Sequence, residues 1–174
     1  AQMARPHTAD FVNAIQARYD LGADWRPGGS KYSPTWVNER FWQLAASSPD
    51  PLRKRVAFAL HQIFMISLTD SNLFDQARGY AAYLDTLNQH AFGNFRNLLD
   101  DIALSPAMGI YLSHMRNRPE DATSGRMPDE NFAREVMQLF TIGLHQLNID
   151  GTPMLGGNGQ PVETYTNDDV MALV

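Results

Sequence analysis

The 174-residue sequence predicts an all-α fold, an irregular multi-helix bundle with one small β-hairpin near residues 145–166. Two observations predict this fold. Apolar residues recur at the three- and four-residue spacing of amphipathic helices from His7 to Leu144. After Leu144 that period gives way to short alternating runs between turn dipeptides, which is typical of a hairpin. Because 44% of the residues are hydrophobic, we expect 1–174 to form a single helical domain.

Composition and charge exclude several classes of protein. The net charge is −5 and no basic cluster is present, which argues against nucleic acid as a partner. No apolar run is long enough for insertion into a membrane. Because the chain has no cysteine, it can form neither disulfides nor thiolate metal sites, and it has no cysteine nucleophile.

The first part of the chain predicts six helices with apolar faces. The third of these is apolar almost all round after Arg55, so we expect it to be buried on most sides. His61 lies within it, and a histidine there is either a satisfied core residue or a ligand. The basic run Arg53-Lys54-Arg55 near the start of this helix predicts acidic partners elsewhere in the chain, for which Glu39 or Asp100 could serve. The predicted helices span 7–19, 35–46, 51–68, 72–90, 95–103 and 106–112.

The helix predicted from Pro128 to Leu144 has the clearest amphipathic signature and the densest set of polar groups. Pro128 suits its first turn. Glu130 and Arg134 are four residues apart and can form a salt bridge. This polar side is either a solvated face or the wall of a polar cavity that holds a metal, a ligand or another domain. Its members are Glu130, Asn131, Arg134, Glu135, Gln138 and Thr141.

The end of the chain carries a helix start. Thr166 and Asp169 have the spacing of a capping box, and no helix stop signal follows before Val174. We therefore expect the sequence to be the N-terminal or central portion of a longer chain, whose C-terminal segment packs against this part.

Several motifs, taken in order, resemble the bacterial family catalogued as domain of unknown function 1800. The resemblance covers about residues 49–174. Two positions depart from the family pattern: Ile63 stands where many members have a second histidine, and Gln138 where they have a glutamate. The motifs are Pro51-Leu52-Arg53, HAFGNFR at 90–96, PAMGIYL at 106–112, DENFAREVMQLFTIG at 129–143 and TYTNDDV at 164–170.

What the resemblance implies is a setting rather than a reaction. Members generally look exported and are often encoded beside a sulfatase-like family. The resemblance therefore implies a periplasmic or extracellular location and, as a partner, another protein of the same exported system. It implies no cofactor, so cofactors stay unknown.

Three functions remain open. The first is a structural or interaction role for an exported helical module. The second is a metal-dependent, hydrolase-like enzyme, for which Glu130, Glu135, Arg134 and His61 are the candidate catalytic residues, with Arg96, His90 and Gln138 as binding residues and no confident metal ligand. If such a site exists, His61, His90, Glu130 and Glu135 should converge. The third is a glycan or small-molecule binding domain with stacking surfaces at Trp25, Trp36, Trp42 and Tyr111.

Overall fold

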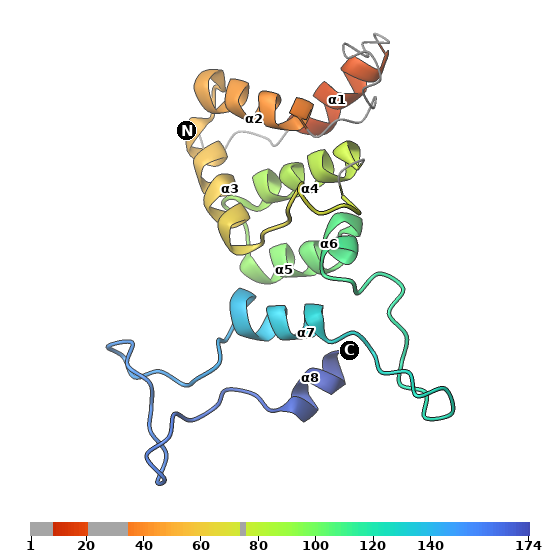
Figure 1. Cartoon of the computed structure of the whole chain (residues 1–174). Coiled ribbons are helices and arrows are strands. Elements are labelled where there is room, and N and C mark those ends of the chain that lie inside the picture. The colour runs from red at the N-terminus through yellow and green to blue at the C-terminus, as the bar shows by residue number, and fades with distance from the viewer. Residues whose placement is uncertain (1–8, 21–34, 74–75) are drawn as a thin grey trace. The chain divides into compact units, whose positions relative to one another are not determined.

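The computed structural model describes residues 9–20, 35–73 and 76–174, and within these ranges the chain is all-α without a β-strand (Figure 1). The predicted all-α class is confirmed. The helices are α1 (Asp10–Asp20), α2 (Thr35–Ser47), α3 (Pro51–Ile63), α4 (Ala77–His90), α5 (Phe95–Ala103), α6 (Pro106–Tyr111), α7 (Asn131–Glu135), the π-helix η1 (Val136–Phe140) and α8 (Asn167–Leu173).

The chain divides into two compact units, which we describe separately. Unit 1 spans Ala1–Tyr111 and contains α1 to α6, and unit 2 spans Leu112–Val174 and contains α7, η1 and α8. The prediction of a single domain stays a prediction.

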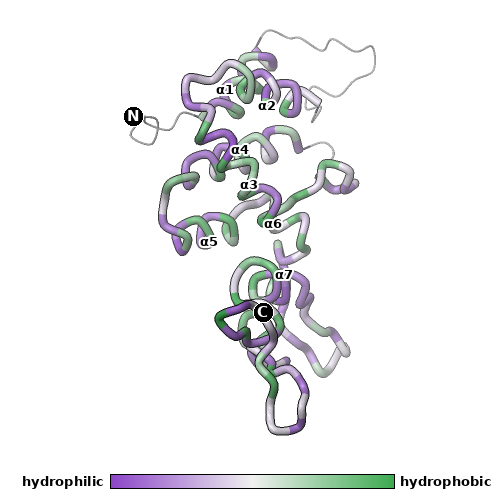
Figure 2. The backbone as a smooth tube through the Cα atoms, turned by 90° about the vertical axis from the view of Figure 1, so that its left-hand side faces the viewer, coloured by the Kyte–Doolittle hydropathy of each residue, from purple (hydrophilic) through white to green (hydrophobic). Residues whose placement is uncertain are grey.

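Helix α4 is the centre of unit 1, and it packs against α1, α2, α3, α5 and α6. Its inward face carries Tyr80, Tyr83, Leu84 and Leu87, all buried. Figures 1 and 2 show α4 between the α1–α2 pair and α5, and the colours of Figure 2 show that the helices of unit 1 carry both apolar and polar positions. Asp85 on the same helix is also buried, so the apolar core of unit 1 encloses a carboxyl group.

Helix α3 differs from its prediction in length and in orientation. It ends at Ile63 rather than near Leu68, and the predicted burial on most sides is wrong. Arg53 and Lys54 are buried with Ala57, whereas Phe58 is 48% exposed. Arg53 and Lys54 face inward because they form ion pairs there with Asp50 and Asp10. Part of the apolar surface of α3 therefore faces solvent.

In unit 2 the long helix predicted over 128–144 is a short α-helix that runs into a π-helix. It begins at Asn131, just after Asp129, whose N–H and C=O both bond the Asn117 side chain. In η1 the N–H of Ile142 reaches the C=O of Met137, five residues back. The extra residue in this turn shifts the buried face. Leu139 is therefore 60% exposed, and Phe140 beside it is 6% exposed.

The hairpin predicted near 145–166 is not seen, since only isolated antiparallel bridges occur there. Three extended segments bond in a ring: the N–H of Gln146 donates to Val162, that of Val162 to Met154, and that of Met154 to Gln146. Each segment therefore bonds the other two through a single residue, which is Gln146, Met154 or Val162. Pro153 and Pro161 lack the N–H groups that a continuous ladder would need. Figure 1 shows the result as loops without arrows.

The last helix agrees with its prediction. Asp169 N–H donates to the Thr166 hydroxyl, and Thr166 N–H donates to the Asp169 carboxylate, so the predicted capping box is confirmed.

A substitution at Gly143 tests whether a positive φ at this residue ends η1. The φ of Gly143 is +75° with no atom near an added Cβ, so Gly143→Ala should cost about 1–2 kcal/mol through backbone strain alone. Amide hydrogen exchange at Ile142 should accelerate by about 5–30-fold. Gly157→Ala is the matched control, because Gly157 is equally uncrowded and lacks a positive φ. Equal exchange in the two variants would contradict the assigned helix end.

Candidate functional site

The polar groups predicted on the 128–144 helix lie in unit 2, and two of them form a structural contact. Arg134 Nε donates to Glu130 Oε2 at 2.9 Å, and Arg134 Nη2 donates to Asn167 Oδ1 at 2.8 Å. This pair therefore ties α7 to the start of α8. Glu135 is half-buried and Gln138 is exposed. Neither side chain makes a hydrogen bond or an ion pair within the part of unit 2 that the structure describes.

The histidine and arginine candidates of unit 1 have separate surroundings. His61 Nε2 lies 3.4 Å from the Tyr80 hydroxyl, and burial lowers the pKa of His61, so the ring is neutral near pH 7. His90 Nε2 lies 2.6 Å from Asp101 Oδ2. In the described part of the chain Arg96 does not pair with Asp100.

The predicted convergence of four groups involves both units. His61 and His90 belong to unit 1, whereas Glu130 and Glu135 belong to unit 2, so their convergence stays a prediction. Among the residues that the structure describes, no three His, Asp or Glu side chains are grouped so that they could hold a metal.

The candidate stacking residues have different surroundings. Trp36 is 2% exposed and belongs to the core, so it offers no stacking face. Trp42 is 68% exposed, and Tyr111 is half-buried. Trp25 lies outside the described residues. Trp42 is thus the tryptophan of the described part that a ligand can reach.

Trp42 stands beside a cavity of about 310 Å³ in unit 1. Helices α1, α2, α3 and α4 all contribute to its lining. Aromatic rings form much of the wall, from Phe11, Phe41, Trp42, Phe58 and Tyr80. The polar groups that reach it are Asn38, Lys54, His61, Gln62 and Asn88. A largely apolar hollow with a few polar groups is the usual form of a small-ligand site.

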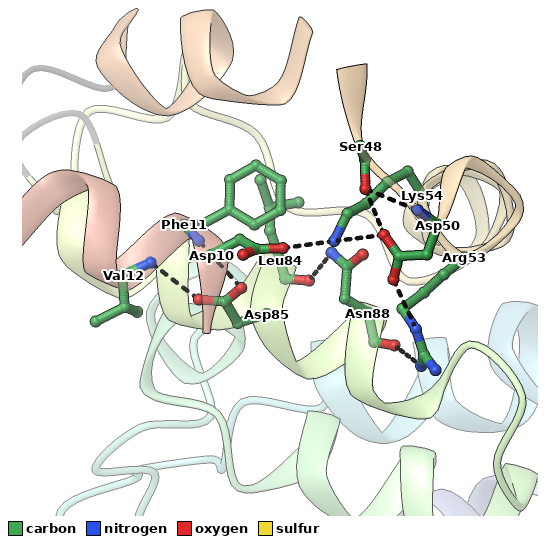
Figure 3. Close-up of polar contacts among 10 residues, drawn as sticks. All are labelled: Asp10, Phe11, Val12, Ser48, Asp50, Arg53, Lys54, Leu84, Asp85 and Asn88. Atoms are coloured by element: carbon green, nitrogen blue, oxygen red, sulfur yellow. Dashed lines mark hydrogen bonds and ion pairs between the residues drawn. The ribbon is translucent and has the colours of Figure 1, made fainter. Parts of the chain in front are cut away.

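A buried ion network underlies this cavity (Figure 3). Lys54 Nζ lies 2.8 Å from Asp10 Oδ2 and 4.0 Å from Asp50 Oδ1. Arg53 Nε lies 3.2 Å from Asp50 Oδ2, and Arg53 Nη1 donates to the Asn88 carbonyl at 2.8 Å. The network joins α1, the start of α3 and the end of α4. The acidic partners of the basic run are therefore Asp10 and Asp50, and the predicted Glu39 and Asp100 are wrong: Glu39 pairs instead with Arg18.

Asp85 holds the start of α1 against α4. Its two carboxylate oxygens accept the N–H groups of Phe11 at 3.2 Å and Val12 at 2.9 Å (Figure 3). Burial raises the pKa of Asp85 to about 6, and the nearby Asp10 adds to this effect, while the two N–H bonds and Lys54 oppose it. Phe11, which Asp85 positions, forms part of the cavity wall.

Sequence periodicity missed this cavity, because the signal lies in pairs distant along the chain. Asp10 is 44 residues from Lys54, and Asp85 is 74 residues from Phe11. Asp50 was the one local clue, since it stands three and four residues before Arg53 and Lys54.

In the part of the chain that the structure describes, no helix combines the length and the apolar character that crossing a membrane requires.

The pKa of Asp85 gives a testable pH dependence. Because its pKa is higher in the folded state than the ordinary 3.8, the folded chain keeps a proton that the unfolded chain loses. The stability that Asp85 contributes is therefore fully present below about pH 4 and is lost as the pH rises through about 6, by about 1–3 kcal/mol. In urea unfolding, the difference between the native chain and Asp85→Asn should fall over that range.

The control for this titration is Asp100→Asn, which alters an exposed carboxylate on α5. Its difference from the native chain should stay level over the same range. A level difference for Asp85→Asn as well would contradict the raised pKa.

Comparison with known proteins gives one family and no characterised relative. No curated protein matches the chain, and no solved structure matches it. The model of the family described as "Protein of unknown function (DUF1800)" matches residues 2–173. The match reaches almost to the first residue, well before the start near residue 49 that the motifs predicted. The chain belongs to the DUF1800 family.

Proposed function

We propose that this DUF1800 chain is a non-catalytic binding module of an exported bacterial protein, and that the cavity of unit 1 is its ligand site. The observation that carries the proposal is the position of Trp42. A large aromatic side chain, 68% exposed, borders a hollow of about 310 Å³ that four helices enclose.

The size and lining of the cavity support a small organic ligand. Ligand sites in proteins measure about 300–1,000 Å³ and combine apolar walls with a few polar groups. The cavity lies at the lower end of that range. Full burial of an aromatic side chain such as Trp42 or Phe58 contributes about 1.5–3 kcal/mol, so a ligand that covers these rings gains affinity from them.

The fixed positions of the walls also support binding. Lys54 on α3 and Asp10 on α1 form an ion pair beneath the cavity, and Tyr83 on α4 donates its hydroxyl to the Phe64 carbonyl just after α3. These contacts hold the helices together without the ligand. A site that is already formed loses little conformational entropy on binding.

The enzyme alternative has less support in the contacts of its candidate residues. Arg134 is held by Glu130 and Asn167, and His61 lies beside Tyr80. These contacts are those of structural side chains. Glu135 stays as the candidate general base, and loss of a measurable activity in Glu135→Gln would favour the enzyme over the binding module.

The location is proposed from the family resemblance alone. We propose a periplasmic or extracellular site for the protein, with another exported protein as its partner. Cell fractionation of the native host tests this location, and recovery of the protein in the cytoplasmic fraction alone would contradict it.

The binding function is tested with p-cresol, an uncharged ring with one hydroxyl group. Titration into the full chain should shift the indole N–H resonance of Trp42 in a saturable manner. The resonance is assigned by its loss in Trp42→Phe. Phe58→Ala should weaken binding by about tenfold or more, because it removes one aromatic wall.

Ile63→Ala is the matched control, since Ile63 has the same exposure as Phe58 on the same helix and does not line the cavity. It should leave the titration unchanged. If neither p-cresol nor the saccharide probe described below perturbs the Trp42 resonance at millimolar concentration, the cavity is not a ligand site.

A further inference from the structure

We infer that the ligand of the unit 1 cavity is a neutral saccharide, held with a sugar ring against Trp42 and a second ring in the adjoining hollow. This inference rests on the binding function proposed above and names the chemical class of the ligand. The juxtaposition that carries it is an exposed aromatic ridge beside side chains that both donate and accept hydrogen bonds.

The aromatic ridge consists of Phe41, Trp42 and Phe58. The Phe41 and Trp42 rings meet edge to face with centroids 5.2 Å apart, and the Phe41 and Phe58 centroids are 5.5 Å apart. The face of an aromatic ring carries negative charge density, which attracts the polarised C–H groups on one side of a sugar ring. Exposed aromatic faces therefore suit saccharides as well as apolar compounds.

The ridge borders two hollows rather than one. A second hollow of about 200 Å³ shares Phe41, Trp42, Lys54 and Phe58 with the cavity of about 310 Å³. Two adjoining hollows over a common ridge favour an extended ligand built of repeated rings. A linear oligosaccharide has this form, whereas a single compact ring would occupy only one hollow.

The polar groups at the cavity match hydroxyl groups. Asn38 and Gln62 carry amides, each of which presents a donor and an acceptor, and His61 is a neutral imidazole whose Nε2 already lies beside the Tyr80 hydroxyl. A sugar hydroxyl likewise donates and accepts. Asn88 also belongs to the lining, but its Oδ1 is shielded from solvent and its amide nitrogen donates to the Leu84 carbonyl, so hydroxyl recognition falls to Asn38 and Gln62.

The charges argue against other ligands. Lys54 is the cation of the larger cavity, and its charge is matched by Asp10 and Asp50, so an anionic ligand gains little there; Arg55 lines only the second hollow. A purely apolar ligand would cover His61 and the two amides without bonding them, and a polar group that is buried without a hydrogen bond weakens binding. A neutral ligand rich in hydroxyl groups avoids both costs.

The test compares cellotriose with p-cresol on the full chain, again through the indole N–H of Trp42. In cellotriose the β-1,4 links and equatorial hydroxyls leave both faces of each ring apolar, which suits a flat aromatic partner. The expected result is a saturable shift with cellotriose at millimolar concentration. Gln62→Ala should weaken cellotriose binding at least fivefold and p-cresol binding less than twofold, because a cresol has one hydroxyl group and no second ring.

Further variants locate the site. Trp42→Ala should abolish cellotriose binding, assessed by line broadening of saccharide protons, and Ile63→Ala should leave it unchanged. Both side chains are exposed, so neither change threatens the fold. Cellotriose binding that survives Trp42→Ala would overturn the inference.

The outcomes separate the two proposals. Saturable binding of p-cresol without binding of cellotriose would overturn the saccharide inference and leave the binding function standing. Failure of both probes would overturn both proposals. Cellotriose binding that is insensitive to Gln62→Ala would show contact with the ridge alone and would overturn the hydroxyl recognition proposed here.

Discussion

The ion pair between Lys54 and Asp10 is the contact on which unit 1 depends. The side chain of Lys54 is 5% exposed, and its ion pair with Asp10 joins α3 to α1. A buried ammonium group is tolerated only when its charge is paired and its donors are satisfied. Asp10 and Asp50 meet that condition, and Asp85 fixes the same end of α1 through two backbone N–H groups.

This pairing sets the orientation of α3 and thereby the character of the surface. With Arg53 and Lys54 turned inward, Phe58 on the same helix stays half exposed beside α2. Phe41 and Trp42 on α2 meet it there, and a hollow remains between these rings and α4. The cavity is therefore a consequence of the buried charges. An α3 packed on its apolar side would have hidden Phe58 and left no aromatic ridge.

Local rules predicted the local features of the fold. Helix positions follow from apolar spacing, and the capping box follows from Thr166 and Asp169 alone. The rules failed where distant contacts decide. No pattern near Lys54 identifies Asp10, and the apolar run of α3 predicted burial on most sides, whereas Phe58 and Ile63 are 48% exposed. In η1 one extra residue per turn moved Leu139 outward, which a fixed period of 3.6 cannot anticipate. Of the candidate site, sequence reasoning identified Trp42 and His61 but not the cavity that both of them line.

Urea unfolding of Lys54→Met measures the central claim most directly. Removal of the ammonium takes the Lys54 charge away from the part-buried Asp10, while Asp50 keeps Arg53 as its partner, and we expect a loss of about 3–5 kcal/mol at pH 7. Arg55→Met, which changes the exposed basic residue next to it, should alter the unfolding free energy by less than about 0.5 kcal/mol. Equal, small effects of the two changes would show that the buried ion pair does not hold α1 and α3 together, and would contradict this account of the cavity.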